Sequence, residues 1–318
     1  VVEPLLHGAI VLHALAESQG GHDCAAPLIA GEAVIAFADD AAGASCALEG
    51  DEGALRLSGS KPVVRHGDLA GHFLVSASHN GAPALVLVDA GAEGLTREAM
   101  RLIDGSSAAT LHFSSTPARL IAADAAALID RLAALHLIGL CAEAAGIARA
   151  MCDQTFAYLI TRKQFGMPLA GFQALQHRAA DMHIAAEEAR VLAARAADLF
   201  DGGNPATLRF AAAAKAQIDR IVQRAGNDAV QLHGGMGVSD ELSTSHHFRR
   251  LAAIRAEGGA AADLRALVLA SDEPLPLTAG ETPDIAAFRA EVRAFTQDHL
   301  AQDIAAKGRI GLEIVKGD

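Results

Sequence analysis

The sequence predicts an α+β protein in which a small antiparallel β-domain precedes an antiparallel helical bundle. Residues 31–122 carry short runs of β-forming residues separated by glycines, and residues 123–270 show apolar side chains at helical spacing. A length of 318 residues is enough for more than one packed core. With 51% hydrophobic and 20% charged residues, the composition excludes a disordered chain.

Residues 1–30 are expected to be the remnant of an N-terminal helical domain. Apolar residues at Leu5, Ile10, Leu12 and Leu15 predict a helix that ends at the glycines 20–21. The chain starts inside this pattern, so we expect a truncated N-terminal domain.

The β-domain is predicted from five runs of β-forming residues. Asn80-Gly81 and Asp104-Gly105 separate some of these runs as turns, which favours antiparallel pairing. The predicted strands are AVIAF at 33–37, ALRLSG at 54–59, HFLVSAS at 72–78, ALVLVD at 84–89 and TLHFSS at 110–115.

The helical bundle is predicted from three long helices and two short ones. Gly166 and Pro168 end the first helix, Asn204-Pro205 is expected to cap the third, and the short helices flank the glycines 258–259. The long helices are placed at 125–163, at 172–200 and from Asn204 to His233.

Residues 271–283 are rich in proline and acidic residues and are predicted to be a linker. After it, Ile285, Phe288, Val292 and Phe295 repeat at helical spacing. Residues 284–318 are therefore expected to be the first helix of a following module.

The charge pattern excludes several classes of partner. The formal net charge is -12 and no basic tract occurs, so neither nucleic acid nor an anionic membrane surface is an expected partner. The apolar run at 9–16 is too short to span a bilayer. The four cysteines form no C-x-x-C pair and suggest a reducing compartment, so a cytoplasmic protein is predicted.

The histidine spacing does not predict a metal site. His246 and His247 are adjacent, so their side chains diverge on a helix. His177 and His183 are six residues apart, which does not match the i, i+4 spacing of helical metal ligands.

Two motifs in the bundle carry a family resemblance. RKQFGMPLAGFQALQHRAADM at 162–182 and QLHGGMGVSDE at 231–241, with GSKPVVRHG at 59–67, make residues 1–270 resemble the acyl-CoA dehydrogenases. The sequence most resembles the small subunits of two-subunit acyl-CoA dehydrogenases of the pimeloyl-CoA and steroid side-chain types. Residues 288–318 resemble the N-terminal segment of the large subunit. This order would arise if the chain were a fusion of the two subunits that is truncated at both ends.

The resemblance implies FAD as the cofactor and implies which residues contact it. Arg162 matches the arginine that holds the FAD pyrophosphate of a neighbouring subunit, a task that suits a planar guanidinium. Gly237 is expected to be a plain helix C-cap. For Phe172, packing in the core is as expected as contact with the flavin. The implied FAD contacts are Arg162, Gln164, Phe165, Phe172, Gln173, Gln231, Gly234 and Gly235.

The β-domain departs from the family pattern near the expected flavin ring. The family usually has a Thr-Glu-Pro-Gly loop where this chain has FADDAAGAS at 37–45. The family tryptophan that follows G-x-K is Val63 here. The resemblance therefore implies an altered flavin pocket.

The catalytic base also departs from the family pattern. Family members remove the substrate α-proton with a glutamate, and that position falls on Gly258. Glu257, one residue earlier, is the candidate base if the loop slips by one residue. Some relatives take the base from an earlier helix, where the matching residue is His136. Glu143 lies nearby and is expected to make an interhelical polar contact.

Three functions remain open at this point. The first is FAD-dependent α,β-dehydrogenation of an acyl-CoA, in fatty acid or steroid side-chain catabolism, with Glu257 as base. The second is a non-catalytic partner subunit that completes the FAD site of a catalytic subunit. A helical structural protein without cofactor is disfavoured by RKQFG together with QLHGG. The implied partners are an electron-transfer flavoprotein or similar acceptor and further subunits in a dimer or tetramer.

Overall fold

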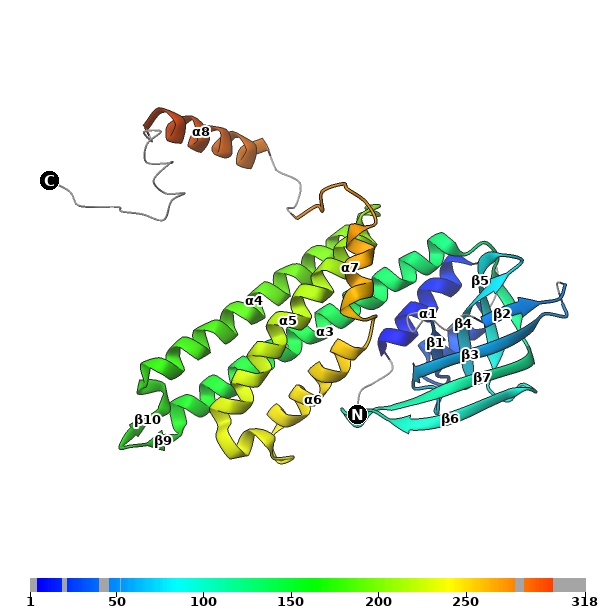
Figure 1. Ribbon diagram of the computed structural model, residues 1–318, viewed down its shortest axis with the longest axis horizontal. Coiled ribbons are helices and arrows are strands. Elements are labelled where there is room, and N and C mark those ends of the chain that lie inside the picture. Colours follow the sequence, from blue (N-terminus) through cyan, green and yellow to red (C-terminus); the bar gives the residue numbers. More distant parts are fainter. Residues whose placement is uncertain (1–4, 19–21, 40–45, 52, 278–282, 300–318) are drawn as a thin grey trace. The chain divides into compact units, whose positions relative to one another are not determined.

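The computed structural model describes residues 5–18, 22–39, 46–51, 53–277 and 283–299. The chain divides into two compact units, Val1–Leu275 and Pro276–Asp318. The first unit contains the β-sheet and the helical bundle (Figure 1). Its element order confirms the predicted α+β class.

Eight strands form one mixed sheet with the order β6-β7-β3-β2-β4-β5-β8, and β1 pairs with β4 outside this path. The predicted antiparallel arrangement is wrong for two pairs, because β1 and β2 both run parallel to β4. They share one edge of β4, whose other edge pairs with β5. The strands are β1 (Ile35–Ala38), β2 (Cys46–Glu49), β3 (Arg56–Arg65), β4 (His72–His79), β5 (Ala82–Asp89), β6 (Leu95–Arg101), β7 (Ser107–Pro117) and β8 (Arg119–Ala122).

Local turn chemistry explains the β4–β5 hairpin. Asn80 and Gly81 both have positive φ, 51° and 83°, as the favoured two-residue hairpin turn requires. Strand β6 was not predicted because it has no apolar alternation, and most of its side chains are exposed. Strands β2 and β8 were also missed, and each is only four residues long.

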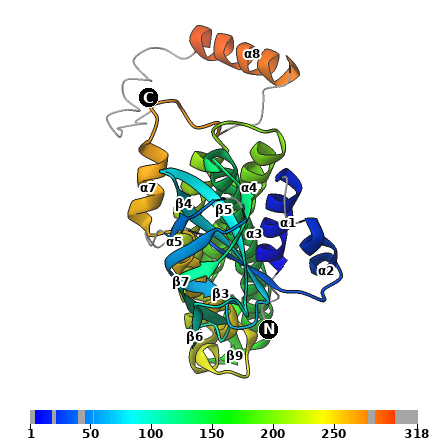
Figure 2. The same cartoon turned by 90° about the vertical axis from the view of Figure 1, so that its right-hand side faces the viewer.

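The sheet buries side chains on both faces. Along β1, Ile35 and Phe37 pack with helical residues, while Ala36 and Ala38 pack within the sheet core. Helix α1 (Leu5–Glu17) lies against β1 and against the first long helix (Figure 2). Two further short helices, η1 (His22–Cys24) and α2 (Ala25–Ile29), follow α1.

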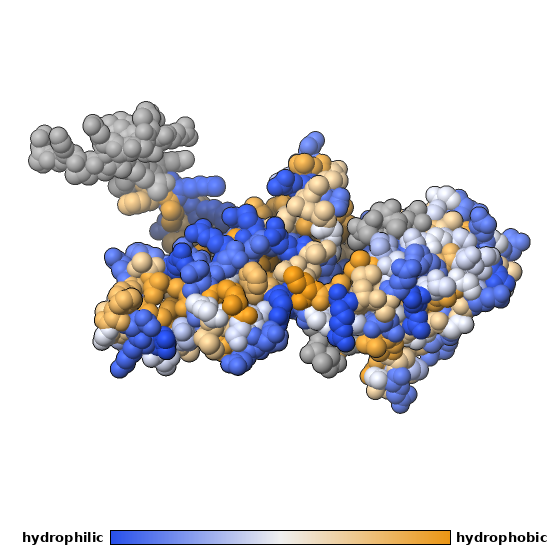
Figure 3. All heavy atoms as spheres, turned by 60° about the horizontal axis from the view of Figure 1, so that its bottom comes forward, coloured by the Kyte–Doolittle hydropathy of each residue, from blue (hydrophilic) through white to orange (hydrophobic). Residues whose placement is uncertain are grey.

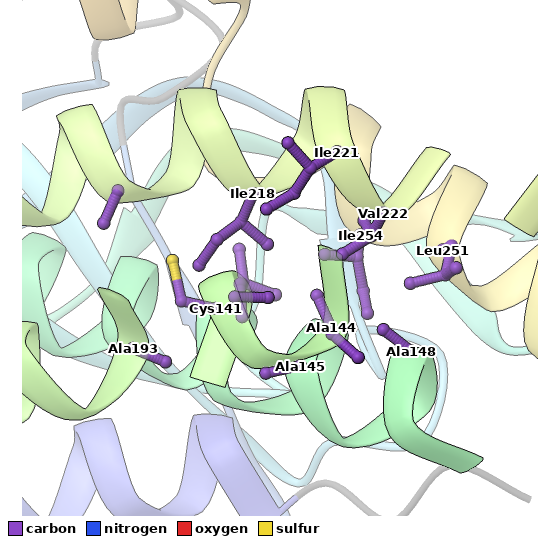
Figure 4. Close-up of a cluster of buried hydrophobic side chains, with 14 of the residues drawn as sticks. Cys141, Ala144, Ala145, Ala148, Ala193, Ile218, Ile221, Val222, Leu251 and Ile254 are labelled. Atoms are coloured by element: carbon purple, nitrogen blue, oxygen red, sulfur yellow. The ribbon is translucent and has the colours of Figure 1, made fainter. Parts of the chain in front are cut away.

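The bundle consists of three long helices and two short ones, as predicted. In its core, small residues of α3 such as Ala144 and Ala148 lie close to Ile218, Val222 and Ile254 (Figure 4). Small side chains at helix contacts allow the backbones to approach closely. The helices are α3 (Ala126–Thr161), α4 (Gln173–Asp201), α5 (Thr207–His233), α6 (Ser243–Ala256) and α7 (Ala261–Leu269).

One predicted helix boundary is wrong. Asn204 does not cap α5, which begins at Thr207. Its side-chain Oδ1 instead accepts a hydrogen bond from the backbone N–H of Ala206, 2.9 Å away, and closes a turn before the helix. Asparagine is equally suited to caps and turns, so sequence alone did not distinguish them.

Helix α3 is long and apolar enough to span a bilayer by length and composition. In this fold it is a core helix, because 56% of its most apolar 18-residue window is buried and it packs against α4 and α5. The cytoplasmic location stays a prediction.

The predicted linker at 271–283 begins as part of the first unit. Arg209 on α5 donates hydrogen bonds to the carbonyl oxygens of Ser271 and Glu273, and Leu275 packs against the bundle core. The second unit contains helix α8 (Pro283–His299). The helix predicted after the linker is confirmed, and its residues Phe288, Val292 and Phe295 are exposed.

Candidate functional site

A cavity of about 1630 Å³ lies between the sheet and the bundle. Residues of α1, β1, β3, α3, α5 and the α6–α7 connection line it. Its charged lining includes both signs: His7, Asp39, Arg65, His136, Arg220 and Glu257. A large cavity with converging titratable groups is the expected form of a small-molecule site.

Glu257 reaches this cavity because α6 ends immediately before it. The residue has extended backbone angles, and Gly258 and Gly259 follow with φ of 83° and 101°. A Cβ on Gly258 would lie 2.8 Å from Leu137 and 3.0 Å from Leu140 on α3. A side chain at Gly258, the position expected from the resemblance to carry the base, would therefore require these leucines to move and would be strained by the positive φ.

The carboxylate of Glu257 has a different set of partners on each oxygen. Oε1 lies 3.2 Å from Nε2 of His136 and 3.5 Å from Nε2 of His7. Oε2 lies 2.5 Å from Nε of Arg65 and 3.8 Å from Nη1 of Arg250. Four positively charged or protonatable side chains from α1, β3, α3 and α6 therefore surround one carboxylate.

The network continues away from the cavity through Arg250. Its guanidinium binds both carboxylate oxygens of Glu143 at 2.6 Å and Oδ2 of Asp104 at 3.0 Å. Asp104 also pairs with Arg65 at 3.3 Å. The expected interhelical polar contact of Glu143 is confirmed, because it joins α3 to α6.

These contacts set the protonation of the site. Burial alone would raise the pKa of Glu257, but the hydrogen bond with His136, the nearby His7 ring and the charges of His136 and Arg65 hold this pKa well below the usual range. Burial lowers the pKa of His7. Burial would also lower the pKa of His136, but Asp39 and Glu257 raise it to about 9. At neutral pH, Glu257 is therefore a carboxylate and His136 carries a proton.

The residues implied to contact FAD lie elsewhere on the bundle. Arg162 caps the C-terminus of α3, and the two-stranded hairpin β9 (Lys163–Gln164) and β10 (Met167–Pro168) follows it. Phe165 at the hairpin turn is 89% exposed and makes an edge contact with Phe172. The short helix η2 (Leu169–Gly171) then leads to Gln173, the first residue of α4.

The two family motifs lie at the same end of the bundle. Tyr158, one turn before Arg162, stacks on His233 with ring centroids 4.6 Å apart. His233 is the last residue of α5, and η3 (Gly234–Val238) follows it. The structure therefore brings the ends of α3 and α5 together, as the motif pairing suggested.

Glycines in the second motif have different roles. Gly234 has φ 62° and ψ −140°, and Cβ atoms on Gly234 or Gly235 would meet nothing within 4 Å. The backbone there is open to a ligand. The expected cap role of Gly237 is wrong: Gly234 is the C-cap, and a Cβ on Gly237 would overlap the backbone of Val230.

The two candidate sites are far apart within one chain. His136 and Arg162 lie on the same helix, 26 residues apart, which corresponds to about 39 Å at 1.5 Å per residue. One chain therefore does not place Arg162 beside Glu257.

The flavin region of the β-domain is only partly described. Residues 40–45 of the FADDAAGAS segment lie outside the described residues. Val63, at the family tryptophan position, lines the cavity and is 52% exposed. Its φ of 53° is unusual for a β-branched residue and coincides with a register shift in the β3–β7 pairing.

Sequence reasoning missed most partners of Glu257. Arg65 and His66 were inside the quoted GSKPVVRHG motif, but their burial was not foreseen. His7 lies in an apolar helix, where a buried histidine is an available signal, but His13 in the same helix gives the same signal. Arg250 and Asp104 gave no signal, because their contact joins positions 146 residues apart.

Comparison with known proteins agrees with this architecture. A family model described as acyl-CoA dehydrogenase, C-terminal domain, matches residues 134–271. The short-chain specific acyl-CoA dehydrogenases of Bos taurus mitochondria and Megasphaera elsdenii are 33% and 32% identical, each over 70% of this chain and over 59% and 63% of the relative. FadE34 of Mycobacterium tuberculosis is 32% identical over 79% of this chain and 36% of its own length. The chain thus spans between about a third and two thirds of these relatives.

Solved structures give the same result. A variant of the Tcur3481-Tcur3483 steroid ACAD superposes with a TM-score of 0.76 at 30% identity, covering 84% of this chain and 77% of that one. Butyryl-CoA dehydrogenase from Megasphaera elsdenii gives 0.74 at 25% identity, covering 82% and 74%. The sequence matches and the fold agree, and the chain belongs to the acyl-CoA dehydrogenase family.

Proposed function

We propose that this chain forms part of an FAD-dependent oxidoreductase that introduces a Cα–Cβ double bond into an acyl-CoA thioester. Membership of the family, together with a cavity of about 1630 Å³ beside Glu257, supports this proposal. The reaction removes a proton from Cα and a hydride from Cβ. FAD, when bound, supplies the hydride acceptor.

The residues at the bundle end fit the FAD pyrophosphate of a neighbouring copy. Arg162 is exposed, and the backbone at Gly234 and Gly235 is open on its Cβ side. Guanidinium and backbone N–H groups are the usual phosphate partners. The separation of about 39 Å along α3 supports a role for these residues at a cofactor other than the one beside their own Glu257. Gln164, Phe165, Phe172, Gln173 and Gln231 complete the proposed contact set.

Exposed apolar side chains support an oligomer. Several gather over the hairpin end of the bundle, the left end in Figure 3. Large exposed apolar groups commonly mark protein interfaces. The exposed residues include Ile160, Phe165, Met236 and Val238, with Ile184 and Val191 on α4. Light scattering should give a dimer or tetramer; a monomer at all concentrations would contradict the shared cofactor site.

Glu257 is the proposed base in this first candidate function. Its side chain is 13% exposed and lines the cavity, so it has access to a bound ligand. The ion pair with Arg65 and the contact with His136 must loosen before the carboxylate can accept a proton. A base with a strongly lowered pKa is a weak proton acceptor.

A second candidate function follows from these ion pairs. A chain in which Arg65 and His136 hold the carboxylate of Glu257 is suited to a non-catalytic subunit. Such a subunit would complete the FAD site of a catalytic partner through Arg162. An electron-transfer flavoprotein or similar acceptor would then serve the assembly.

Flavin content and acyl-CoA-dependent dye reduction of the purified full-length protein test both functions. If Glu257 is the base, Glu257→Gln abolishes dye reduction while flavin content stays unchanged. A yellow wild-type protein that reduces no dye with any acyl-CoA identifies the partner role. Arg162→Met should lower flavin content, with the exposed Arg190→Met as matched control. Flavin content unaffected by Arg162→Met would overturn the pyrophosphate assignment.

A further inference from the structure

Three side chains in the cavity converge in a way that the sequence spacing did not suggest. His7 comes from α1, His136 from α3 and Glu257 from the α6–α7 connection, so the set joins positions up to 250 residues apart. One nitrogen or oxygen atom of each residue lies within 4.8 Å of the other two. We propose that His7, His136 and Glu257 form a binding site for a divalent transition-metal ion of the zinc type.

The distances fit a tetrahedral ion. Zinc binds histidine nitrogen and carboxylate oxygen at about 2.0–2.1 Å, so two ligands of a tetrahedral site lie roughly 3.3 Å apart. Oε1 of Glu257 is 3.2 Å from Nε2 of His136 and 3.5 Å from Nε2 of His7. Two of the three ligand-to-ligand distances therefore already have the required length, and the third, between the two histidine nitrogens, is at most 4.8 Å.

His7 supplies an independent observation. Its side chain is 8% exposed, and neither Nδ1 nor Nε2 makes a hydrogen bond although both atoms are buried. A buried imidazole without hydrogen bonds is costly unless another partner satisfies it. Its ring meets the His136 ring at 68° with centroids 5.5 Å apart. The two rings are therefore not stacked on each other.

The surrounding side chains are of the kind that orient metal ligands by contacting their other polar atoms. The Nδ1 atom of His136 faces Oδ2 of Asp39 at 3.7 Å, and histidine ligands usually pair their second nitrogen with a carboxylate. Arg65 contacts only Oε2 of Glu257, which leaves Oε1 directed at the histidines. A guanidinium on the outer oxygen would orient the carboxylate as a ligand.

The nearby arginines do not make the pocket positive. Arg65 and Arg250 are both shared with Asp104, and Arg250 also holds Glu143. Three carboxylates, counting Glu257, thus face two guanidiniums. Asp39 adds a carboxylate beyond His136. Among these groups four carboxylates face two guanidiniums, which favours a cation, and metal binding would release the proton that His136 carries in the metal-free protein.

Such an ion would cross-link α1, α3 and the α6–α7 connection. Three protein ligands leave a fourth position for water on the cavity side, since all three residues line the cavity. The ion would occupy the carboxylate oxygen that proton abstraction needs. Metal binding and a base role for Glu257 therefore exclude each other, while FAD contacts at Arg162 are independent of both.

The test is a metal titration of the full chain without a polyhistidine tag. The Cys24→Ser background removes the only partly exposed thiol among the described residues. After treatment with a chelator, the protein should bind one Zn²⁺ or Co²⁺ per chain, and Co²⁺ should give the visible absorption of a tetrahedral nitrogen and oxygen site. Binding at no defined stoichiometry would overturn the proposal.

Ligand variants locate the site. His7→Gln and His136→Gln should each weaken binding at least tenfold. The matched control is His66→Gln, because that ring is buried 6.0 Å from His7 but lies outside the ligand set. Equal weakening in the control would contradict the assignment. The melting temperature of the background protein should rise with Zn²⁺ but not with Mg²⁺, since Mg²⁺ prefers oxygen ligands. No rise with Zn²⁺ would count against the site even if the ligand variants fail to fold.

Discussion

Arg250 is the residue whose removal should most directly weaken the junction between the sheet and the bundle. It lies on α6, is 8% exposed, and binds Glu143 on α3 and Asp104 in the β6–β7 connection. The informative change is Arg250→Met, which keeps an unbranched apolar stem and removes the guanidinium. This substitution leaves two carboxylates without their shared cation.

The loss in free energy of unfolding depends on which partners Glu143 and Asp104 keep after Arg250→Met. Removing one partner of a buried ion pair costs about 3–5 kcal/mol. Glu143 has a side chain that is 32% exposed and rehydrates in part. Asp104 is only 1% exposed, but it keeps Arg65 at 3.3 Å and the hydroxyl of Ser106 at 2.6 Å. We therefore expect Arg250→Met to lower the free energy of unfolding by about 3 kcal/mol, the lower end of that range.

Thermal unfolding followed by circular dichroism measures the effect. A loss of about 3 kcal/mol corresponds to roughly 6–12 °C for a domain of this size. Arg250→Lys should lose much of the same stability, because a single ammonium does not bind two oxygens of Glu143 in a fork. Arg149→Met is the matched control, since its pair with Asp153 is exposed and should contribute nothing measurable. If both methionine variants melt within about 2 °C of each other, the reasoning is refuted.

Three further predictions concern single positions. Lys215 is fully buried 2.6 Å from Asp219, so Lys215→Met should cost about 3–5 kcal/mol in urea unfolding, and adding Asp219→Leu should restore most of it; no recovery would contradict the ion-pair explanation. The pKa of His136 is about 9 in the folded protein, above its ordinary 6.5. Protonated His136 therefore contributes fully to the free energy of unfolding below pH 6.5, and this contribution is lost as pH rises through 9. With chelator present, the difference in unfolding midpoint between wild type and His136→Gln should be larger at pH 6 than at pH 10. Equal differences at the two pH values would disprove the stabilising role of the protonated ring. Gly234→Ala should destabilise by about 1–3 kcal/mol because of its positive φ, whereas Gly235→Ala should leave the melting temperature nearly unchanged.

The fold class and the bundle were predictable because they depend on local signals. Apolar spacing and glycine breaks located α3, α4 and α5 to within a few residues. The Asn80-Gly81 turn fixed one hairpin through the positive φ that both residues tolerate. The parallel pairs β1–β4 and β2–β4 were not predictable, because strand partners distant in sequence leave no local trace.

Local sequence was enough to locate the motifs: Arg162 near a helix end, the glycines after α5, and Gly258 where the resemblance places the base. The surroundings of Glu257 became known only from the packing of the folded chain. Its contacts with His7, Arg65 and His136 join positions separated by 121 or more residues. Motifs record which side chains are available, whereas the burial and charge that set their chemistry depend on how distant segments pack.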